Sequence, residues 1–148
     1  YGQGQVLANP LHLAVMYTAF SNSGSMITPY LIYKDDPSAE VWIDQAISKE
    51  HSSLLTEDLK AVVNNPAGSG YAAHRTDMEL AGKTGTAELK SEQGTTGQEI
   101  GWFSVFTTDP SASKPVLLTS MVESVEDKGG STYVVKKDAA VLDSYFGS

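Results

Sequence analysis

The sequence contains no cysteine among its 148 residues. A chain without cysteine forms no disulfide bond, offers no thiol nucleophile and builds no zinc site on thiolate ligands. It also lacks any apolar run long enough to cross a bilayer. Its 10 Lys and Arg face 18 Asp and Glu, a formal net charge of −8. Without a basic cluster, such a chain is a poor partner for nucleic acid or an anionic membrane. Nothing in it indicates a metal or another cofactor.

The most informative stretch is Lys83-Thr84-Gly85-Thr86, which places a cation and two hydroxyls beside a glycine. Neighbouring apolar residues predict a strand, in which Lys83 and Gly85 share one face and Thr84 and Thr86 share the other. An ammonium beside a hydroxyl suits a carboxylate. Free N–H groups on a strand edge can bind an extended peptide or a developing oxyanion.

Gly82-Lys83-Thr84 is also the tail of a phosphate-binding P-loop, and this alternative must be weighed. A P-loop needs an earlier glycine where this chain has Asp77, and it needs a helix that starts at the lysine. Gly85 and Thr86 follow instead and favour extended chain. The nucleotide hypothesis is therefore strongly disfavoured.

Periodicity and capping residues predict an α+β fold of one domain. Helices are expected at Pro10–Asn22, from Ser48 to about Asn64, and at Thr132–Phe146. A small hairpin should join the first two helices. An antiparallel three-strand meander is expected from Met78 through the motif, at Ile100–Phe106 and at Pro115–Val125.

The helices also carry predictions about burial. The first is apolar nearly all round, which is typical of a buried helix, and His12 on it is interpreted as a packed core histidine. His51, in the first turn of the second helix, should be solvated. The inward stripe of the second helix should consist of Leu55, Leu59 and Val62, with Leu54 and Val63 alongside it. The third should face inward with Val134, Val135, Leu142, Tyr145 and Phe146.

The order of four landmarks carries a family resemblance. The segment from Ala81 to Glu88 resembles the third active-site motif of penicillin-binding proteins and serine β-lactamases. Residues 1–5, followed by Asn9-Pro10, are similar to the segment before a helix in class B transpeptidases. The turn 68–73 and Gly101-Trp102-Phe103 resemble the segments that flank the motif strand. The whole resembles the low-affinity class B type associated with methicillin resistance.

The resemblance implies that residues 1–148 are a single partial domain, the C-terminal portion of a transpeptidase domain. In the family, a serine attacks the D-Ala-D-Ala peptide of a peptidoglycan stem, and β-lactams acylate the same serine. Lys83 would keep the site electropositive and Thr84 would bind the terminal carboxylate. Gly85 would let the substrate backbone approach. The Thr86 N–H would serve the oxyanion hole, and Tyr1 and Gln3 would line the cleft.

The nucleophile of the family is missing. Ser111-Ala112-Ser113-Lys114 matches Ser-x-x-Lys, but it lies after the motif strand and between two prolines, where a helix is not expected. We interpret it as a coincidence, and the family's Ser-x-Asn motif has no match. No Ser-His-Asp triad is apparent either, and His74 beside Arg75 is weak evidence for one. The chain alone should be inert, with its nucleophile upstream in the parent protein.

The resemblance further implies a membrane anchor upstream and a site on the extracytoplasmic face of a bacterial membrane. Expected partners are the stem peptide, β-lactams and the upstream remainder of the domain. Without that remainder, the last strand has an open edge, and the isolated chain should be marginally stable or self-associate. Two alternatives stay open: a fragment of a β-lactam sensor or serine β-lactamase, and a non-catalytic acidic binding module.

Overall fold

An antiparallel sheet in the order β3-β4-β5 forms the centre of the molecule. The structure is a computed structural model that describes residues 6–32, 35, 38–89, 97–109 and 111–147. The strands span Leu80–Leu89 (β3), Gln98–Thr107 (β4) and Leu117–Glu123 (β5). The helices span Pro10–Ser21 (α1), Lys49–Asn64 (α2) and Ser131–Phe146 (α3). The expected α+β meander is confirmed.

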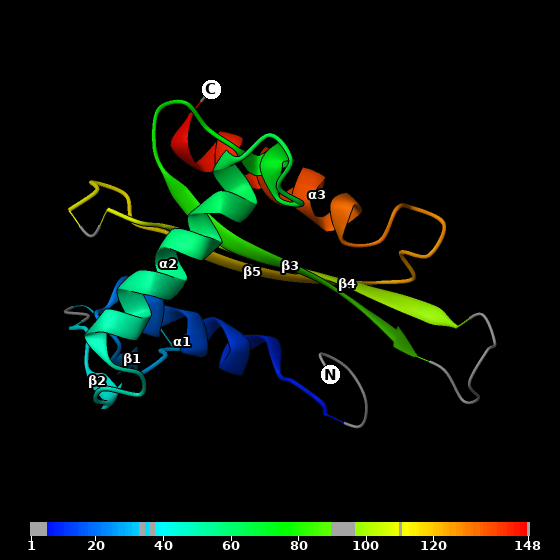
Figure 1. Ribbon diagram of the computed structural model, residues 1–148. Coiled ribbons are helices and arrows are strands. Elements are labelled where there is room, and N and C mark those ends of the chain that lie inside the picture. The colour runs from blue at the N-terminus through cyan, green and yellow to red at the C-terminus, as the bar shows by residue number, and fades with distance from the viewer. Residues whose placement is uncertain (1–5, 33–34, 36–37, 90–96, 110, 148) are drawn as a thin grey trace.

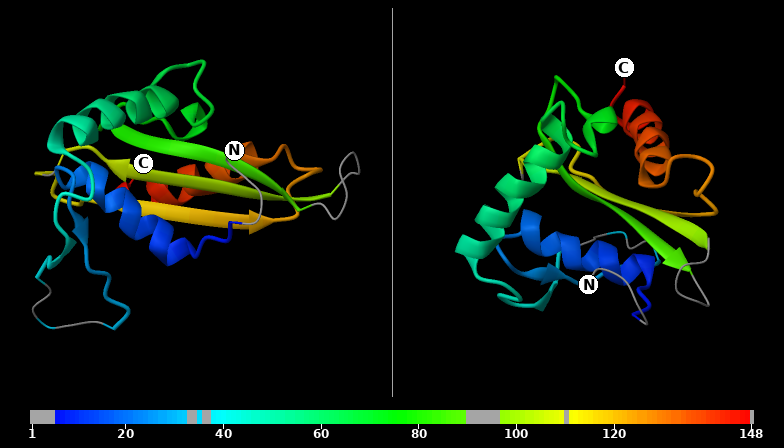
Figure 2. Two further views of the ribbon diagram at one scale, coloured as in Figure 1. Left: turned by 60° about the horizontal axis from the view of Figure 1, so that its bottom comes forward. Right: turned by 45° about the vertical axis from the view of Figure 1, so that its right-hand side comes forward.

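The helices surround the sheet on different sides. Helix α3 lies on one face and α1 on the opposite face (Figure 1). Helix α2 crosses beside β3 at the edge of the sheet, as both views of Figure 2 show. Between α1 and α2, strands β1 (Met26–Ile27) and β2 (Val41–Ile43) form the expected hairpin. A short 3-10 helix, η1 (Tyr71–Ala73), precedes β3.

Helix α1 begins and ends where its capping residues predict. The Asn9 side chain accepts a hydrogen bond from the Leu11 N–H at 2.9 Å. Gly24, at φ +101°, stands just past the end of the helix. The prediction that α1 is buried is wrong for the described residues, since Met16 is 50% exposed. His12 is exposed too, with its ring 6.1 Å from that of Trp42.

Helix α2 also begins at its predicted cap, because the Ser48 hydroxyl accepts a hydrogen bond from the His51 N–H. His51 is exposed, as expected. The predicted inward face is partly wrong: Leu55 is 40% exposed and Leu54 beside it is 62% exposed, whereas Ser52 is buried. The Ser52 hydroxyl donates to the Ala19 carbonyl at 3.0 Å. The first half of α2 therefore contacts α1 through a polar face, and its last turn buries Val63 in the core.

The main core lies between α3 and the sheet. From α3 it includes Val134, Val135 and Leu142, as predicted, packed with Phe103 and Val105 of β4. Gly101 permits this close approach, because a Cβ on it would lie 2.7 Å from Cγ2 of Val134. The prediction that Tyr145 faces inward is wrong, because this residue is 44% exposed. Asp138, for which the sequence made no prediction, is buried.

Strands β3 and β5 form the two edges of the sheet, and within the described residues no further strand pairs with either. Exposed edges invite pairing with another chain. We therefore expect the isolated chain to self-associate through β5. Met121 is exposed on this strand, so Met121→Lys should shift the chain toward monomer in sedimentation velocity.

The matched control is Ser53→Lys, which adds the same charge at an exposed position of α2. It should leave the association unchanged. A wild-type chain that sediments as a monomer at every concentration would contradict the expectation.

Candidate functional site

The Lys83–Thr86 motif lies in the middle of edge strand β3. Its partners on β4 run from Ser104, opposite Lys83, to Gly101, opposite Thr86. No helix starts at Lys83, so the P-loop alternative is wrong. The motif is thus a stretch of extended backbone at the border of the sheet.

The register determines which backbone groups face outward. The Thr108 N–H donates to the Glu79 carbonyl at 3.3 Å, so these residues form a hydrogen-bonded pair. Such pairs alternate with non-bonded ones along an antiparallel ladder. Leu80, Thr84 and Thr86 therefore belong to non-bonded pairs. The backbone N–H and C=O groups of these three residues point away from β4, to the outer edge of the sheet.

Two contacts agree with this assignment. The side-chain amide of Asn64, at the end of α2, donates to the Leu80 carbonyl at 2.8 Å. The ammonium of Lys83 donates to the Thr84 carbonyl at 2.7 Å. Helix α2 thus covers the edge at Leu80. Farther along the edge the Thr86 N–H points outward, where it can donate to an incoming acceptor.

The side chains of the two threonines lie on the same face as the α3 core, because Thr84 is opposite Phe103. The Thr84 hydroxyl lies 2.7 Å from the hydroxyl of Ser69, in the loop that precedes η1. The Thr86 hydroxyl accepts a hydrogen bond from the Ser131 N–H at 3.2 Å. A distant segment therefore contacts each motif threonine.

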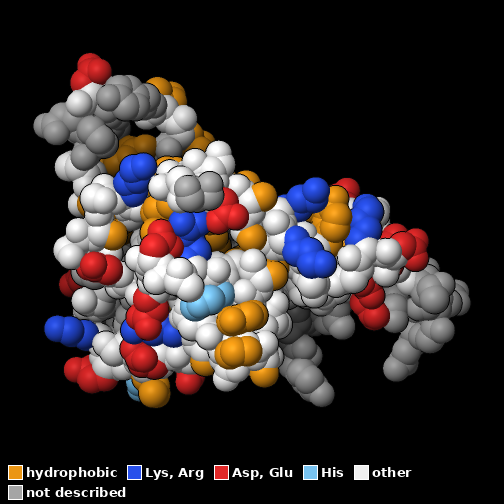
Figure 3. Space-filling model, turned by 90° about the horizontal axis from the view of Figure 1, so that it is seen from above, with side chains coloured by type: hydrophobic (Ala, Val, Ile, Leu, Met, Phe, Trp, Pro, Cys, Tyr) orange, Lys and Arg blue, Asp and Glu red, His pale blue; other side chains and the backbone are white. Residues whose placement is uncertain are grey.

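The Thr86 contact joins the motif to the start of α3. Gly130 at the N-cap has no side chain, so Thr86 supplies an acceptor there. Two lysines lie near this end of α3: the Tyr133 ring is 5.6 Å from the Lys128 ammonium and 5.2 Å from that of Lys137. Figure 3 shows Lys side chains gathered at this end of the molecule. Lysines therefore lie near the motif strand, together with the acidic residues Glu99 and Glu126.

The opposite face of the motif holds a polar row. Lys83 shares this face with Ser104, whose hydroxyl lies 3.1 Å from that of Thr119 on β5. Tyr17 of α1 hydrogen-bonds to Ser104. Burial raises the pKa of the Tyr17 phenol, and the bond from Ser104 opposes that rise. The phenol therefore stays protonated at neutral pH and serves as a hydrogen-bonding group under the sheet.

The other candidate residues are distributed as follows. Tyr1 and Gln3 lie outside the described residues. Ser111 belongs to a turn, as expected, and its hydroxyl donates to Asp109 rather than facing a lysine. His74 lies 3.2 Å from the side-chain oxygen of Asn64 and stacks on Tyr71, 5.2 Å away, which indicates a structural role.

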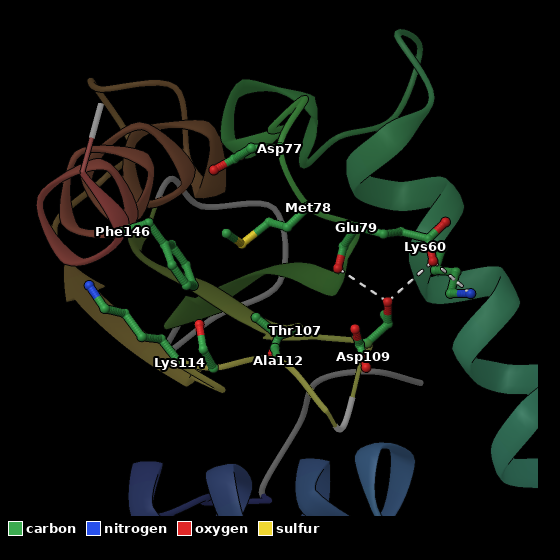
Figure 4. A pocket seen from close by; sticks show the side chains of 11 residues that line it. Lys60, Asp77, Met78, Glu79, Thr107, Asp109, Ala112, Lys114 and Phe146 are labelled. Atoms are coloured by element: carbon green, nitrogen blue, oxygen red, sulfur yellow. Dashed lines mark hydrogen bonds and ion pairs between the residues drawn. The ribbon is translucent and has the colours of Figure 1, made fainter.

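A cavity of about 700 Å³ lies away from the motif, between α2, the start of β3, the end of β4 and the end of α3. Figure 4 shows Met78 and Phe146 on one side of it and Lys60 on the other. Lys60 forms ion pairs of 2.8 Å with Glu57 and with Glu79. The hydrogen bond from Lys60 lowers the pKa of Glu79. These charges satisfy one another, and no motif residue lines the cavity.

The sequence did not reveal the contacts of Ser69, Ser131 and Tyr17. The only signal for Ser69 was its place between Gly68 and Gly70, which indicated a tight turn but not what the hydroxyl reaches. The assembled edge offers an outward N–H, a hydroxyl pair and a nearby ammonium. This set can hold an extended peptide with an anionic end.

Comparisons with known proteins identify the family of the chain. The family model described as the penicillin binding protein transpeptidase domain matches residues 1–142. The chain is 44% identical over 138 residues to Penicillin-binding protein 3 of Bacillus subtilis, covering 93% of this chain and 20% of that protein. It is 28% identical over 112 residues to the Peptidoglycan D,D-transpeptidase FtsI homolog of Mesostigma viride, covering 64% and 19%.

Solved structures show the same fold. The transpeptidase domain of Burkholderia pseudomallei penicillin-binding protein 3 aligns with a TM-score of 0.71 at 20% identity, covering 93% of this chain and 41% of that one. The D,D-transpeptidase domain of an Eggerthella lenta peptidoglycan glycosyltransferase aligns at 0.65 with 26% identity, covering 93% and 32%. The chain spans about a fifth of the length of the Bacillus relative.

Proposed function

Because the chain belongs to the transpeptidase-domain family of penicillin-binding proteins, we propose that it forms the C-terminal part of a serine-type D,D-transpeptidase. Its substrates are peptidoglycan stem peptides that end in D-Ala-D-Ala, and β-lactams mimic them. The observation that carries the proposal is the edge of β3, where Thr84 and Thr86 present outward-facing backbone groups beside the Lys83 ammonium.

The reaction is acyl transfer. A serine hydroxyl adds to the carbonyl carbon of the D-Ala-D-Ala peptide bond, and D-alanine leaves with the hydroxyl proton. The amine of a second stem peptide then attacks the acyl ester, forms the new peptide bond and displaces the serine, whose oxygen regains a proton from the amine. Both steps develop negative charge on the carbonyl oxygen, which an aligned N–H stabilises.

The residues of this chain take distinct roles. The stem peptide lies along the outer edge of β3 as an added strand. The Thr86 N–H donates to the carbonyl oxygen, and the Thr84 hydroxyl donates to the terminal carboxylate. Gly85 leaves room for the peptide backbone, since among the described residues a Cβ there would contact only Trp102, at 3.6 Å. Lys83 contributes positive charge and exchanges its bond to the Thr84 carbonyl for contacts with the serine network.

The nucleophilic serine comes from an upstream part of the domain. The lysine of the same Ser-x-x-Lys motif and the Ser-x-Asn motif come from that part too. We propose that this upstream part covers two surfaces: the exposed apolar side chains of α1 and the free edge of β5. An anchor upstream holds the protein at the extracytoplasmic face of the membrane. In the described residues, no helix is long and apolar enough to span a membrane.

Intact mass after incubation with a penicillin tests the proposal. The chain alone should form no adduct, because it lacks the serine, whereas the protein that includes the upstream half should gain the mass of one penicillin. An adduct on the chain alone would overturn the proposal that the nucleophile lies upstream, and Ser111 would be the first residue to test as the acylated serine. No adduct on either would favour a non-catalytic binding module.

The finer assignment to a low-affinity class B protein rests on the sequence landmarks. It requires slow acylation: the second-order rate constant for penicillin should lie well below that of a penicillin-sensitive transpeptidase measured in parallel. Hydrolysis of the adduct on the scale of seconds would indicate a β-lactamase instead, because a transpeptidase or a sensor keeps its acyl ester.

A further inference from the structure

We infer that Ser69 is a positioning residue of the carboxylate-binding edge, whose hydroxyl orients that of Thr84 toward a ligand. The inference rests on the proposed function of Thr84 and deepens it. The two hydroxyl oxygens are 2.7 Å apart, a short hydrogen bond between residues from different segments. Both side chains retain solvent contact, so a ligand at this edge can reach the pair.

The loop that carries Ser69 is held firmly in place. A Cβ on Gly68 would lie 2.3 Å from the Val62 carbonyl oxygen, and one on Gly70 would lie 3.1 Å from the same atom. The Gly70 N–H donates to that carbonyl at 3.0 Å. The two glycines thus let the loop press against the end of α2, and Ser69 between them projects toward β3. A hydroxyl on a fixed loop loses little freedom when it binds.

The proton count explains what the pair gains. A hydroxyl has one proton and two lone pairs. When Ser69 donates to Thr84, the Thr84 oxygen is occupied as an acceptor and its own proton is free for a carboxylate oxygen. Ser69 then donates to Thr84, and Thr84 donates to the carboxylate. The two hydrogen bonds run in the same direction, so each polarises and strengthens the other. Without Ser69 the Thr84 hydroxyl can rotate away, and the carboxylate loses an aligned donor.

The test uses the intact transpeptidase and two ligands, a penicillin with its free carboxylate and the methyl ester of the same penicillin. Ser69→Ala should slow acylation by the acid about tenfold, as expected for one charge-assisted hydrogen bond. Acylation by the ester should change less than about twofold, because the ester offers no anion to orient toward. Ser69→Thr should restore the acid rate, since it keeps the hydroxyl.

Two controls separate positioning from folding. In a Thr84→Val background, Ser69→Ala should have no further effect, because the partner is already gone. Ser53→Ala, exposed on α2, should leave both rates unchanged. Melting temperatures of all variants are compared with the wild type.

The outcomes distinguish the two proposals. An equal loss with acid and ester, or a loss that persists in the Thr84→Val background, would assign Ser69 a merely structural role and overturn the inference alone. No change with either ligand would also overturn it. A wild-type enzyme that fails to prefer the acid over the ester would remove the role of Thr84, and the inference with it.

Discussion

Replacing Thr86 by proline is expected to slow acylation of the intact enzyme by about 100- to 1,000-fold, the usual effect of deleting one oxyanion donor. Proline lacks an N–H, and the N–H of Thr86 points to the outer edge rather than to β4. The substitution therefore deletes the proposed donor without breaking a bond of the β3–β4 ladder, a position where strands tolerate proline. Acylation by a penicillin, followed by intact mass, measures the effect.

Two comparison variants make this prediction specific. Thr86→Val keeps the N–H but deletes the hydroxyl that accepts from Ser131. It should retain most of the rate while lowering the free energy of unfolding by about 1 kcal/mol, as for a lost N-cap. Gly85→Pro removes an N–H that belongs to a hydrogen-bonded pair and should destabilise the sheet itself.

Equal rates for Thr86→Pro and the wild type would show that the oxyanion donor lies elsewhere. A loss for Thr86→Val as large as that for Thr86→Pro would show that the contact with α3, rather than the N–H, supports the chemistry. Thermal denaturation confirms that the proline variant is folded before its rate is interpreted.

The helix boundaries were predictable because capping is local. Asn9 and Ser48 each bond to an N–H within three residues of themselves, so the sequence already contains both partners. Burial was less predictable because it depends on what packs against the helix. Ser52 is buried because it bonds to the end of α1, and Leu54 is exposed because no described element covers it. No periodicity in α2 alone distinguishes these cases.

In the candidate site, too, local features were predictable and contacts between distant segments were not. The alternation of the motif followed from strand geometry, and the structure places Lys83 and the two threonines on opposite faces as predicted. The contacts of Thr84 and Thr86 join residues 15 and 45 positions apart in the chain. Such contacts depend on how the loop and α3 pack on the sheet, which a local pattern does not determine. Ser69 therefore emerged only from the structure.

The second large predicted effect is on the pH dependence of stability, and it comes from Asp138 of α3, a carboxylic acid buried in the core. Its side chain is 3% exposed. The Ser120 hydroxyl donates to Oδ1 at 2.8 Å, and Oδ2 has no hydrogen-bond partner in the described part of the chain. Burial raises the pKa of this carboxyl to about 6, and the bond from Ser120 only partly offsets the rise.

The sign of the pH dependence follows from this shift. The pKa of Asp138 rises from 3.8 in the unfolded chain to about 6 in the folded protein, so folding favours the protonated form. Below pH 3.8 both states hold the proton and the carboxyl does not affect stability. As the pH rises toward 6 the unfolded state loses its proton first, and stability falls. Above that pH the loss is complete, at most about 3 kcal/mol.

Asp138→Asn should therefore raise the free energy of unfolding by about 2 kcal/mol at pH 8, because it removes the buried charge but leaves an amide N–H to satisfy. The gain should vanish near pH 4. Urea unfolding of both proteins from pH 4 to pH 8 measures the difference, in which the other titrating groups cancel. Asp127→Asn, at an exposed position, is the matched control and should show no such trend. A constant difference between Asp138→Asn and wild type across this range would mean that Asp138 stays ionised in the folded protein, held by a partner on Oδ2 from another part of the molecule.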